Sequence, residues 1–200
     1  MKKLLIATFN QGKLEDYKSF LKDFPLEFVT LSDLGITEDF DEVFDTFEEN
    51  AKAKAEFYAN MSGLPTLADD SGVEIPYYDM EPGVHTKRWD GIGKNDEHYQ
   101  KFILEKIKVI PQNQRSAQLR AVLALSLNGE THMSEGVIKG NLTNEVYPHS
   151  DTHGYPWDRV FIIPEVSKYY EELSDAENHK YNHRRLALQK LNSIIEKHLL

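Results

Sequence analysis

Leu67-Ala68-Asp69-Asp70-Ser71-Gly72 places two adjacent carboxylates where a hydrophobic run gives way to turn-forming residues. We expect residues 67–75 to form a strand, a turn around the acidic pair and a second strand. Neighbouring side chains on an extended backbone point to opposite sides, so only one carboxylate can face a given ligand. Two interpretations remain open. The pair either serves a hard cation, with the second carboxylate orienting a neighbouring group, or is an Asp-rich turn bonded to its own backbone.

A helix is expected upstream of this stretch, because Thr46 and Glu49 form a capping box and Gly63 can end the helix after about Met61. One face of this helix mixes apolar and polar residues at three- and four-residue spacing: Phe47, Asn50, Ala51, Lys54, Ala55 and Tyr58. A lysine on a packed face either binds a counter-charge or a ligand, or extends past Tyr58 into solvent. The pattern leaves both interpretations open.

The N-terminal segment is expected to form a buried strand at residues 4–7 and a helix from about Lys13 to Leu21. Thr8-Phe9-Asn10-Gln11-Gly12-Lys13 joins them. A polar loop between a strand and a helix suits the capture of an anion such as phosphate at the helix N-terminus. The glycine spacing differs from that of a Walker loop, and a simple strand-to-helix turn explains the segment equally well.

The remaining pattern predicts the fold class. Further strands are expected at residues 27–30, 116–127, 134–142 and 160–163, and further helices at about Asn95–Ile107 and at 183–199. Asn128-Gly129 is a typical two-residue hairpin loop. Because strands and helices do not alternate strictly, we expect an α/β fold in which helices flank a mixed sheet.

Composition limits the classes of function. The 200 residues are enough for one domain with a substantial core, and the formal charge of −10 argues against a nucleic-acid partner. No cysteine is present, which excludes disulfides, thiolate zinc sites and a cysteine nucleophile. The apolar run after Met1-Lys2-Lys3 is too short for a signal peptide or a membrane span. We therefore expect a cytoplasmic protein with no membrane partner.

Two segments of the C-terminal half could bind a base. Gly154-Tyr155-Pro156-Trp157-Asp158 combines two aromatic rings and a carboxylate in one turn, and His183-Arg184 opens the last helix. Aromatic rings can stack on a base, while histidine and arginine can bind its acceptor atoms. Alternatively, Trp157 belongs to the core and Arg184 forms a surface ion pair.

In their order along the chain, these stretches resemble the inosine triphosphate pyrophosphatase family from about residue 3 to residue 191. The most specific part is Thr46-Phe47-Glu48-Glu49-Asn50-Ala51, followed by Leu64-Pro65-Thr66 through Gly72 and then Pro82-Gly83-Val84. Thr8, Asn10 and Lys13 match the family's N-terminal pattern. The resemblance implies a single domain over residues 1–200, with two lobes around a deep cleft, and a homodimer.

The resemblance also implies a reaction in which a nucleoside triphosphate and water give a monophosphate and pyrophosphate. It assigns Asp70 as the catalytic carboxylate, with Glu42 and Asp70 as ligands of Mg²⁺. The implied substrate contacts are Thr8, Asn10, Lys13, Lys54, Ser71, Tyr155, Trp157, Asp158, His183 and Arg184. The implied substrates are the deaminated purine nucleotides ITP, dITP and XTP.

The sequence departs from the family pattern at several positions. Val43-Phe44 replaces the family's Thr-Gly directly after Glu42, the implied metal ligand. In the aromatic turn, Pro156 replaces a glycine and Arg159 replaces a proline. Asn178 stands where a lysine is expected, with Lys180 two residues later, and Asn182 replaces a serine. All of these positions concern the nucleoside half or its hinge. Two alternatives follow: the same reaction on a standard or modified nucleotide, or nucleotide binding without turnover.

Overall fold

The computed structural model describes residues 1–92, 97–148 and 155–200. Within this part of the chain, the strands are β1 (Lys2–Ile6), β2 (Leu26–Thr30), β3 (Thr66–Glu74), β4 (Ser116–Leu127), β5 (Glu130–Leu142), β6 (Phe161–Ile163) and β7 (Lys168–Tyr169). The α-helices are α1 (Gln11–Phe20), α2 (Phe47–Ser62), α3 (Glu97–Lys108), α4 (Asp175–Tyr181) and α5 (His183–Leu199). None of the described helices has the length and apolarity needed to cross a membrane.

The strands form a mixed sheet, with the order β2-β1-β3-β4-β5-β6-β7. β1 pairs in parallel with β2 and with β3, whereas β6 pairs antiparallel with β5 and with β7. β4 and β5 are joined by Asn128-Gly129, and both residues have the positive φ (52° and 81°) that a tight hairpin turn requires. The prediction of an α/β fold with helices flanking a mixed sheet is confirmed.

The chain divides into two compact units, and β3, β4 and β5 each contribute residues to both. Unit 1 comprises residues 1–70, 121–136 and 184–200, and unit 2 comprises residues 71–120 and 137–183. The expectation that residues 1–200 act as a single domain with two lobes stays a prediction.

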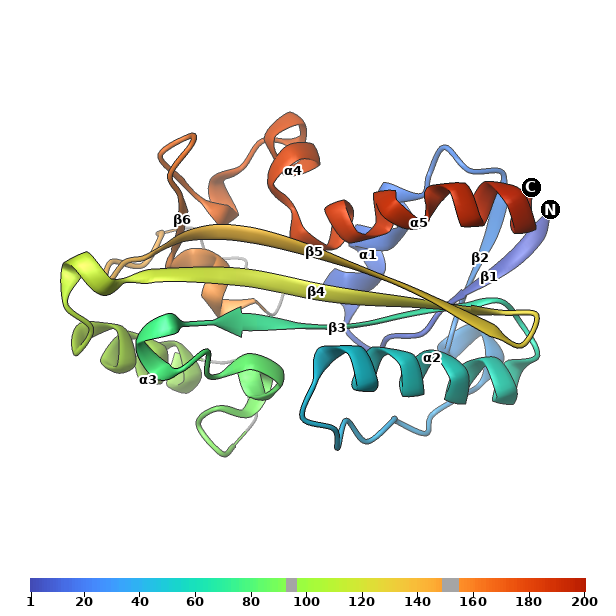
Figure 1. The fold of residues 1–200 in the computed structure, drawn as a ribbon, viewed down its shortest axis with the longest axis horizontal. Helices are drawn as coiled ribbons and strands as arrows, with labels where there is room; N and C mark the ends of the chain where they lie inside the picture. Colours follow the sequence, from blue (N-terminus) through green and yellow to red (C-terminus); the bar gives the residue numbers. More distant parts are fainter. Residues whose placement is uncertain (93–96, 149–154) are drawn as a thin grey trace. The chain divides into compact units, whose positions relative to one another are not determined.

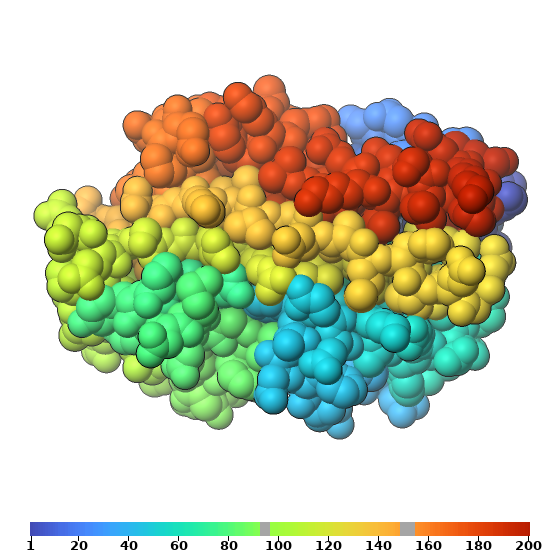
Figure 2. Space-filling model, viewed as in Figure 1, coloured from blue at the N-terminus to red at the C-terminus, as the bar shows by residue number. Residues whose placement is uncertain are grey.

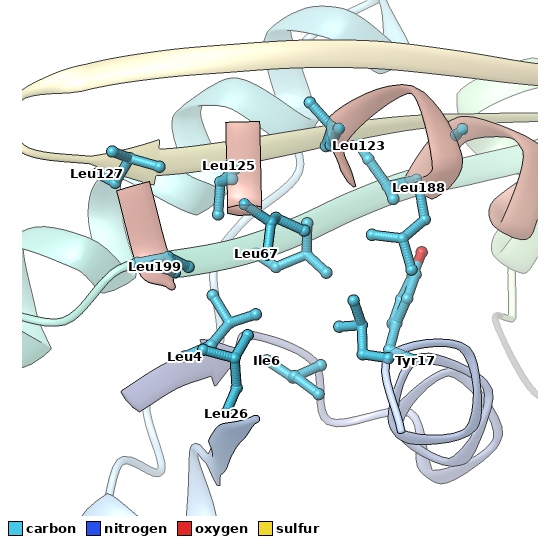
Figure 3. Packing of buried hydrophobic residues seen from close by; sticks show 14 of the residues in the cluster. Leu4, Ile6, Tyr17, Leu26, Leu67, Leu123, Leu125, Leu127, Leu188 and Leu199 are labelled. Carbon is cyan, nitrogen blue, oxygen red and sulfur yellow. The ribbon is translucent and has the colours of Figure 1, made fainter. Parts of the chain in front are cut away.

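Unit 1 has a hydrophobic core to which β1, β2, β3, β4, α1 and α5 contribute side chains (Figure 3). The side chains include Leu4 and Ile6 from β1, Leu26 from β2, Leu67 from β3, Leu123, Leu125 and Leu127 from β4, Tyr17 from α1, and Leu188 and Leu199 from α5. Full burial of a leucine or isoleucine side chain contributes about 1.5–3 kcal/mol to folding. This core holds the start of α1 and the middle of β3, which carry most of the candidate site.

The C-terminal helix is fixed to the hairpin by polar contacts as well. Ser134 Oγ donates a hydrogen bond to the Ala187 carbonyl (2.8 Å), and Lys190 Nζ donates to the Glu135 carbonyl (2.7 Å). On the face shown in Figure 2, α5 and this hairpin are neighbours. Figure 1 shows α5 and α2 on opposite sides of this part of the sheet.

Unit 2 packs α3 and β6 around aromatic rings. Ile103, Ile107 and Phe161 are fully buried. Gly72 marks a close approach within this unit, because a Cβ there would lie 2.4 Å from both the Gly83 carbonyl oxygen and Thr86 Oγ1. The Thr86 hydroxyl accepts from the Val73 amide (2.8 Å) and donates to the Gly83 carbonyl (2.7 Å). Only glycine leaves room for this bridge.

The structure corrects the expected turn around the acidic pair. Asp69 and Asp70 lie inside β3, which is one continuous strand from Thr66 to Glu74. A buried strand tolerates two carboxylates because each has a partner: Asp69 pairs with Lys13, and Asp70 accepts a hydrogen bond from Asn50. The prediction of a turn came from the local sequence, which does not contain these partners.

Other boundaries differ by a few residues. α1 begins at Gln11 because the Asn10 side chain caps it, and β5 begins at Glu130, directly after its hairpin turn. The described part of the third helix starts at Glu97, and the expected start at residue 95 lies outside the described residues. α4 and β7 were not predicted; α4 begins with a capping box formed by Ser174 and Glu177.

Candidate active site

Asp70 lies at the centre of the candidate site in unit 1. Its Oδ2 accepts a hydrogen bond from Asn50 Nδ2 (3.0 Å) on α2. The same Asn50 amide donates to the Phe44 carbonyl (3.1 Å) and accepts from the Phe44 amide (3.0 Å). Asn50 therefore fixes the acidic 38–45 segment and the catalytic candidate to one another, which explains why an amide occupies the packed face of α2.

Lys54 lies on the same face of α2 as Asn50 and forms an ion pair with Glu42 of the acidic 38–45 segment. The Lys54 Nζ lies 2.5 Å from Glu42 Oε1 and 3.4 Å from the Asp69 carbonyl oxygen. The alternative in which Lys54 extends past Tyr58 into solvent is excluded, since its side chain is almost completely buried. The Tyr58 hydroxyl donates to the Glu38 carbonyl (3.0 Å) and accepts from the Phe40 amide (3.1 Å), which adds a second attachment for the acidic segment.

Lys13 and Asp69 form a second ion pair, with Lys13 Nζ 2.8 Å from Asp69 Oδ2. Asp69 is only 1% exposed. At the same helix start, the Asn10 side chain accepts from the Lys13 amide (3.1 Å), and the Thr8 hydroxyl accepts from the Asn10 amide (3.1 Å). The alternation of a strand thus sends Asp69 to α1 and Asp70 to α2, as expected for neighbours on an extended backbone.

These contacts shift the pKa values of the three carboxyl groups in different directions. Burial, and after it the charge of Glu42, raises the pKa of Asp70 to about 7. Burial would also raise the pKa of Asp69, but the charges of Lys13 and Lys54 outweigh it and hold that pKa below its ordinary value. For Glu42 the charge and hydrogen bond of Lys54 likewise overcome burial and lower the pKa. Asp70 is therefore the carboxyl group poised near neutral pH.

The donor set fits a hard divalent cation. Three carboxylates, from Glu42, Asp69 and Asp70, outnumber the two ammonium groups of Lys13 and Lys54, and the pKa of Asp70 is raised first by burial and then by the charge of Glu42. Among the described residues, no three His, Asp or Glu side chains group closely enough to hold a metal by themselves. Mg²⁺ commonly binds through one or two carboxylates and completes its shell with water and substrate phosphates. The two oxygen-bearing side chains of Glu42 and Asp70 are consistent with that mode.

Arg184 is buried in unit 1 and forms an ion pair with Asp16 of α1. The Arg184 Nη1 lies 3.2 Å from Asp16 Oδ2, and the residue is 4% exposed. Arg184 therefore does form an ion pair, but it is buried, so the alternative that placed this pair on the surface is excluded. Burial raises the pKa of Asp16, and the Arg184 charge opposes that shift.

The aromatic turn belongs to unit 2. Tyr155 precedes the 3-10 helix Pro156–Arg159, which contains Trp157 and Asp158, while Gly154 of this motif lies outside the described residues. Trp157 is 4% exposed, and its indole N–H donates to the Tyr99 hydroxyl (3.4 Å). The Tyr99 hydroxyl in turn donates to the Thr86 carbonyl. Trp157 thus fixes the turn to α3, as the core interpretation expected, and its role in substrate binding stays a prediction.

His183 and Ser71 are the other predicted contacts in unit 2. His183 is buried, and its Nδ1 lies 3.2 Å from the Tyr170 hydroxyl. Ser71 is a half-buried residue of β3. The predicted phosphate and metal residues Thr8, Asn10, Lys13, Glu42, Lys54 and Asp70 therefore fall in unit 1 together with Arg184, whereas Ser71, Tyr155, Trp157, Asp158 and His183 fall in unit 2.

The atypical residues of the sequence have structural contacts of their own. Arg159 donates two hydrogen bonds to the Tyr147 carbonyl, from Nε (3.1 Å) and Nη2 (2.8 Å), so it anchors the aromatic turn. Asn182 Nδ2 donates to Asn178 Oδ1 (3.3 Å), so two of the altered positions contact one another. Val43 and Phe44 remain exposed.

Sequence reasoning missed four residues that contact predicted site residues. Asn50 was placed on the correct helix face but without a function, and Asp16 follows Lys13 by three residues on α1, a spacing that could have indicated a shared face. Tyr99 and Tyr170 contact Trp157 and His183 from other parts of the chain. No local pattern indicates either tyrosine.

The fold and the centre in unit 1 define an α/β protein with buried carboxylates and lysines suited to metal-assisted phosphate chemistry. The model of the Ham1 family matches residues 4–194. The chain belongs to this family, and the family recognised from the sequence is confirmed.

Named relatives agree with this assignment over the whole chain. The dITP/XTP pyrophosphatase of Bacillus licheniformis is 36% identical over 197 residues, which cover 98% of this chain and 99% of the relative. The protein of the same name from Bacillus subtilis is 36% identical, with 98% of both chains covered. Among solved structures, the Ham1 protein of Staphylococcus aureus has a TM-score of 0.82 and 31% identity, covering 98% of this chain and 99% of its own. A Ham1 protein from Coxiella burnetii has a TM-score of 0.85 and 29% identity, covering 98% and 100%.

Proposed function

We propose that this protein is a Mg²⁺-dependent pyrophosphatase that hydrolyses ITP, dITP and XTP to the nucleoside monophosphate and pyrophosphate. The observation that carries the proposal is the buried centre in unit 1, where Asp70 has a pKa of about 7 beside the ion pairs Glu42–Lys54 and Lys13–Asp69. Full-length relatives named dITP/XTP pyrophosphatase support the substrate class.

Each residue of this centre has a separate role in the proposed reaction. Asp70 is the general base that removes a proton from the attacking water, because its pKa lies near the operating pH. Lys13 and Lys54 each carry three N–H donors, so each can keep its carboxylate partner and still bind a phosphate oxygen. The N-terminus of α1, capped by Asn10, adds backbone donors for the polyphosphate.

Glu42 and Asp70 would hold the Mg²⁺ ion, which when bound offsets negative charge on the polyphosphate. The Lys54 pair and the Asn50 amide fix these two side chains before any ligand arrives, and such preorganisation is the main way a site lowers a charge-separating barrier. The attack breaks the bond between the α-phosphorus and the bridging oxygen, pyrophosphate leaves, and the water proton passes to Asp70.

The base preference is assigned to His183 and Arg184, which are adjacent in sequence at the start of α5. His183 and Arg184 would donate hydrogen bonds to a 6-oxo purine, and adenine would leave those buried donors unpaired. The contact between Asn178 and Asn182 favours a second candidate, the same reaction with a shifted base preference. The homodimer and the cytoplasmic location stay predictions.

A nucleotide panel tests the proposal. We expect pyrophosphate release with Mg²⁺, and a kcat/KM for ITP and XTP at least ~100-fold above that for ATP, because discrimination against an unpaired polar group reaches this size. Turnover without preference for ITP or XTP would favour the shifted-base alternative. Nucleotide binding without any pyrophosphate release would contradict the enzymatic proposal and favour a nucleotide-binding protein without turnover.

A further inference from the structure

The acidic 38–45 segment, which carries Glu42, lies against α2 in unit 1. It belongs to no helix or strand of the described chain, and apart from Phe40 and Glu42 its side chains are exposed. Its conformation is therefore not fixed by a regular backbone ladder, and exposed segments of this kind open most readily. The position of the Glu42 carboxylate thus depends on the contacts between the segment and the helix beside it.

Three side chains of α2 hold the segment, spaced four residues apart on one helix face: Asn50, Lys54 and Tyr58. They contact residues 44, 42 and 38–40 in that order, so the segment follows α2 in the opposite direction (Figure 1). Four helical residues rise about 6 Å, and two residues of chain span at most about 7 Å. The spacing therefore fits a segment that follows the helix with little slack.

Tyr58 anchors the part of the segment that precedes Glu42. Its hydroxyl accepts a hydrogen bond from the Phe40 amide (3.1 Å) and donates one to the Glu38 carbonyl (3.0 Å). These directions are fixed, because a backbone amide only donates and a carbonyl only accepts. Tyr58 is fully buried, and its ring packs on Phe57, which also contacts the Phe40 ring (centroids 5.0 and 5.6 Å apart). The hydroxyl thus holds two consecutive peptide groups just ahead of Glu42.

Asn50 anchors the part of the segment that follows Glu42. Its side-chain amide exchanges two hydrogen bonds with the backbone of Phe44 and donates a third to Asp70 Oδ2. Asn50 therefore serves both carboxylates of the proposed metal site, whereas the hydroxyl of Tyr58 binds only the Glu42 side. A change at Tyr58 consequently tests the placement of Glu42 without removing a contact to Asp70.

We propose that Tyr58 is a positioning residue that holds Glu42 in place for the divalent cation and thereby sets the metal affinity of the site. The inference rests on the proposed function, in which Glu42 and Asp70 hold the cation. Without the hydroxyl, the chain ahead of Glu42 loses both backbone contacts and must be ordered when the metal binds. This ordering costs conformational entropy, so the metal binds more weakly.

Amide hydrogen exchange of the metal-free protein tests the anchor in the absence of any ligand. We expect the Phe40 amide to exchange at least ~10-fold faster in Tyr58→Phe, because it loses its acceptor and the segment loses both hydrogen bonds of the hydroxyl. Tyr78→Phe is a matched control, since its hydroxyl also donates to a backbone carbonyl, that of Lys106 (2.8 Å) in unit 2. This control should leave the Phe40 amide unchanged. Wild-type exchange of Phe40 in Tyr58→Phe would overturn the proposal.

Metal affinity provides the second measurement. A Mn²⁺ titration should show about 10-fold weaker binding in Tyr58→Phe, the lower end of the effect of groups that orient metal ligands, and wild-type binding in Tyr78→Phe. Wild-type affinity in Tyr58→Phe would refute the positioning role. Absence of Mn²⁺ binding by the wild type would overturn the proposal together with the metal site on which it rests.

The Mg²⁺ dependence of pyrophosphate release separates positioning from general stability. In Tyr58→Phe the Mg²⁺ concentration for half-maximal activity should rise about 10-fold, while kcat at saturating Mg²⁺ stays within about 2-fold of the wild type. A lower kcat with an unchanged Mg²⁺ requirement would show a merely structural role and refute the proposal. If Tyr58 controls Mn²⁺ affinity but the wild type releases no pyrophosphate, the role of Tyr58 is supported and the proposed function is refuted.

Discussion

Asp70→Asn should reduce kcat for ITP by about 10³-fold while making the metal-free protein more stable at pH 8. The loss of activity follows because an amide cannot take the proton of the attacking water, a step that contributes 10²–10⁴-fold in comparable sites. The gain in stability follows because the variant removes a buried charge. The Asn side chain still offers an oxygen to Asn50, so the hydrogen bond at 3.0 Å can be kept. Steady-state kinetics and urea unfolding measure the two effects.

The stability gain has a defined pH dependence. Burial raises the pKa of Asp70 from 3.8 to about 7, so between these values the folded state holds a proton that the unfolded chain has lost. The free energy of unfolding therefore decreases as pH rises through this window, and the penalty is complete above about pH 7. Each pKa unit corresponds to ~1.4 kcal/mol. We expect Asp70→Asn to gain about 2 kcal/mol or more at pH 8 and little at pH 4.

A matched control for this variant is Asp41→Asn, which changes an exposed carboxylate of the same acidic segment. It should leave both kcat and the urea midpoint close to those of the wild type. Wild-type activity in Asp70→Asn would show that another group is the base. A loss of stability at pH 8 would show that the Asp70 carboxylate is better solvated than its burial indicates.

Lys13→Met should destabilise the protein by about 3 kcal/mol, because removing one member of a buried ion pair leaves an uncompensated charge. The partner is Asp69, which is 1% exposed and lies 2.8 Å from the Lys13 ammonium. The charges of Lys54 and Arg184 also act on Asp69, which keeps the expected cost at the lower end of the range. The same variant should raise KM for the nucleotide at least ~10-fold through loss of a phosphate contact. Urea unfolding and initial-rate measurements provide both numbers.

The double variant Lys13→Met/Asp69→Asn separates the two roles of Lys13. Neutralising Asp69 as well removes the unpaired charge, so most of the lost stability should return. The elevated KM should persist, because the ammonium that binds phosphate is still absent. A wild-type KM in the double variant would show that Lys13 serves the fold alone. Equal stability of Lys13→Met and the wild type would show that the ion pair contributes nothing to folding.

The main elements of the fold could be predicted because their signals are local. The capping box of Thr46 and Glu49 and the stop at Gly63 gave the bounds of α2, and Asn128-Gly129 gave the hairpin. The acidic pair was different. A turn was expected there because the apolar run gives way to aspartate, serine and glycine. The strand continues instead because the aspartates have the partners Lys13 and Asn50, which lie 56 and 20 residues away in sequence.

The sequence predicted which residues belong to the candidate site but not which of them contact one another. The sequence indicated that Lys54 shares a face with apolar residues, yet only the structure shows that Glu42 is its counter-charge. The sequence left open whether Asp69 contacts a metal or orients a neighbouring group. In the structure its carboxylate pairs with Lys13 and its carbonyl accepts from Lys54. Tyr99 and Tyr170 remained undetected because a tyrosine carries no spacing signal for a distant indole or imidazole.

A Mn²⁺ titration followed by electron paramagnetic resonance tests the shared carboxylate site most directly. The account predicts one site in the wild type that Mg²⁺ competes for, with at least ~10-fold weaker binding in both Glu42→Gln and Asp70→Asn. Glu38→Gln, an exposed neighbour in the same segment, should bind as the wild type does. Wild-type Mn²⁺ affinity in Glu42→Gln or in Asp70→Asn would contradict the claim that these two side chains hold one divalent ion together.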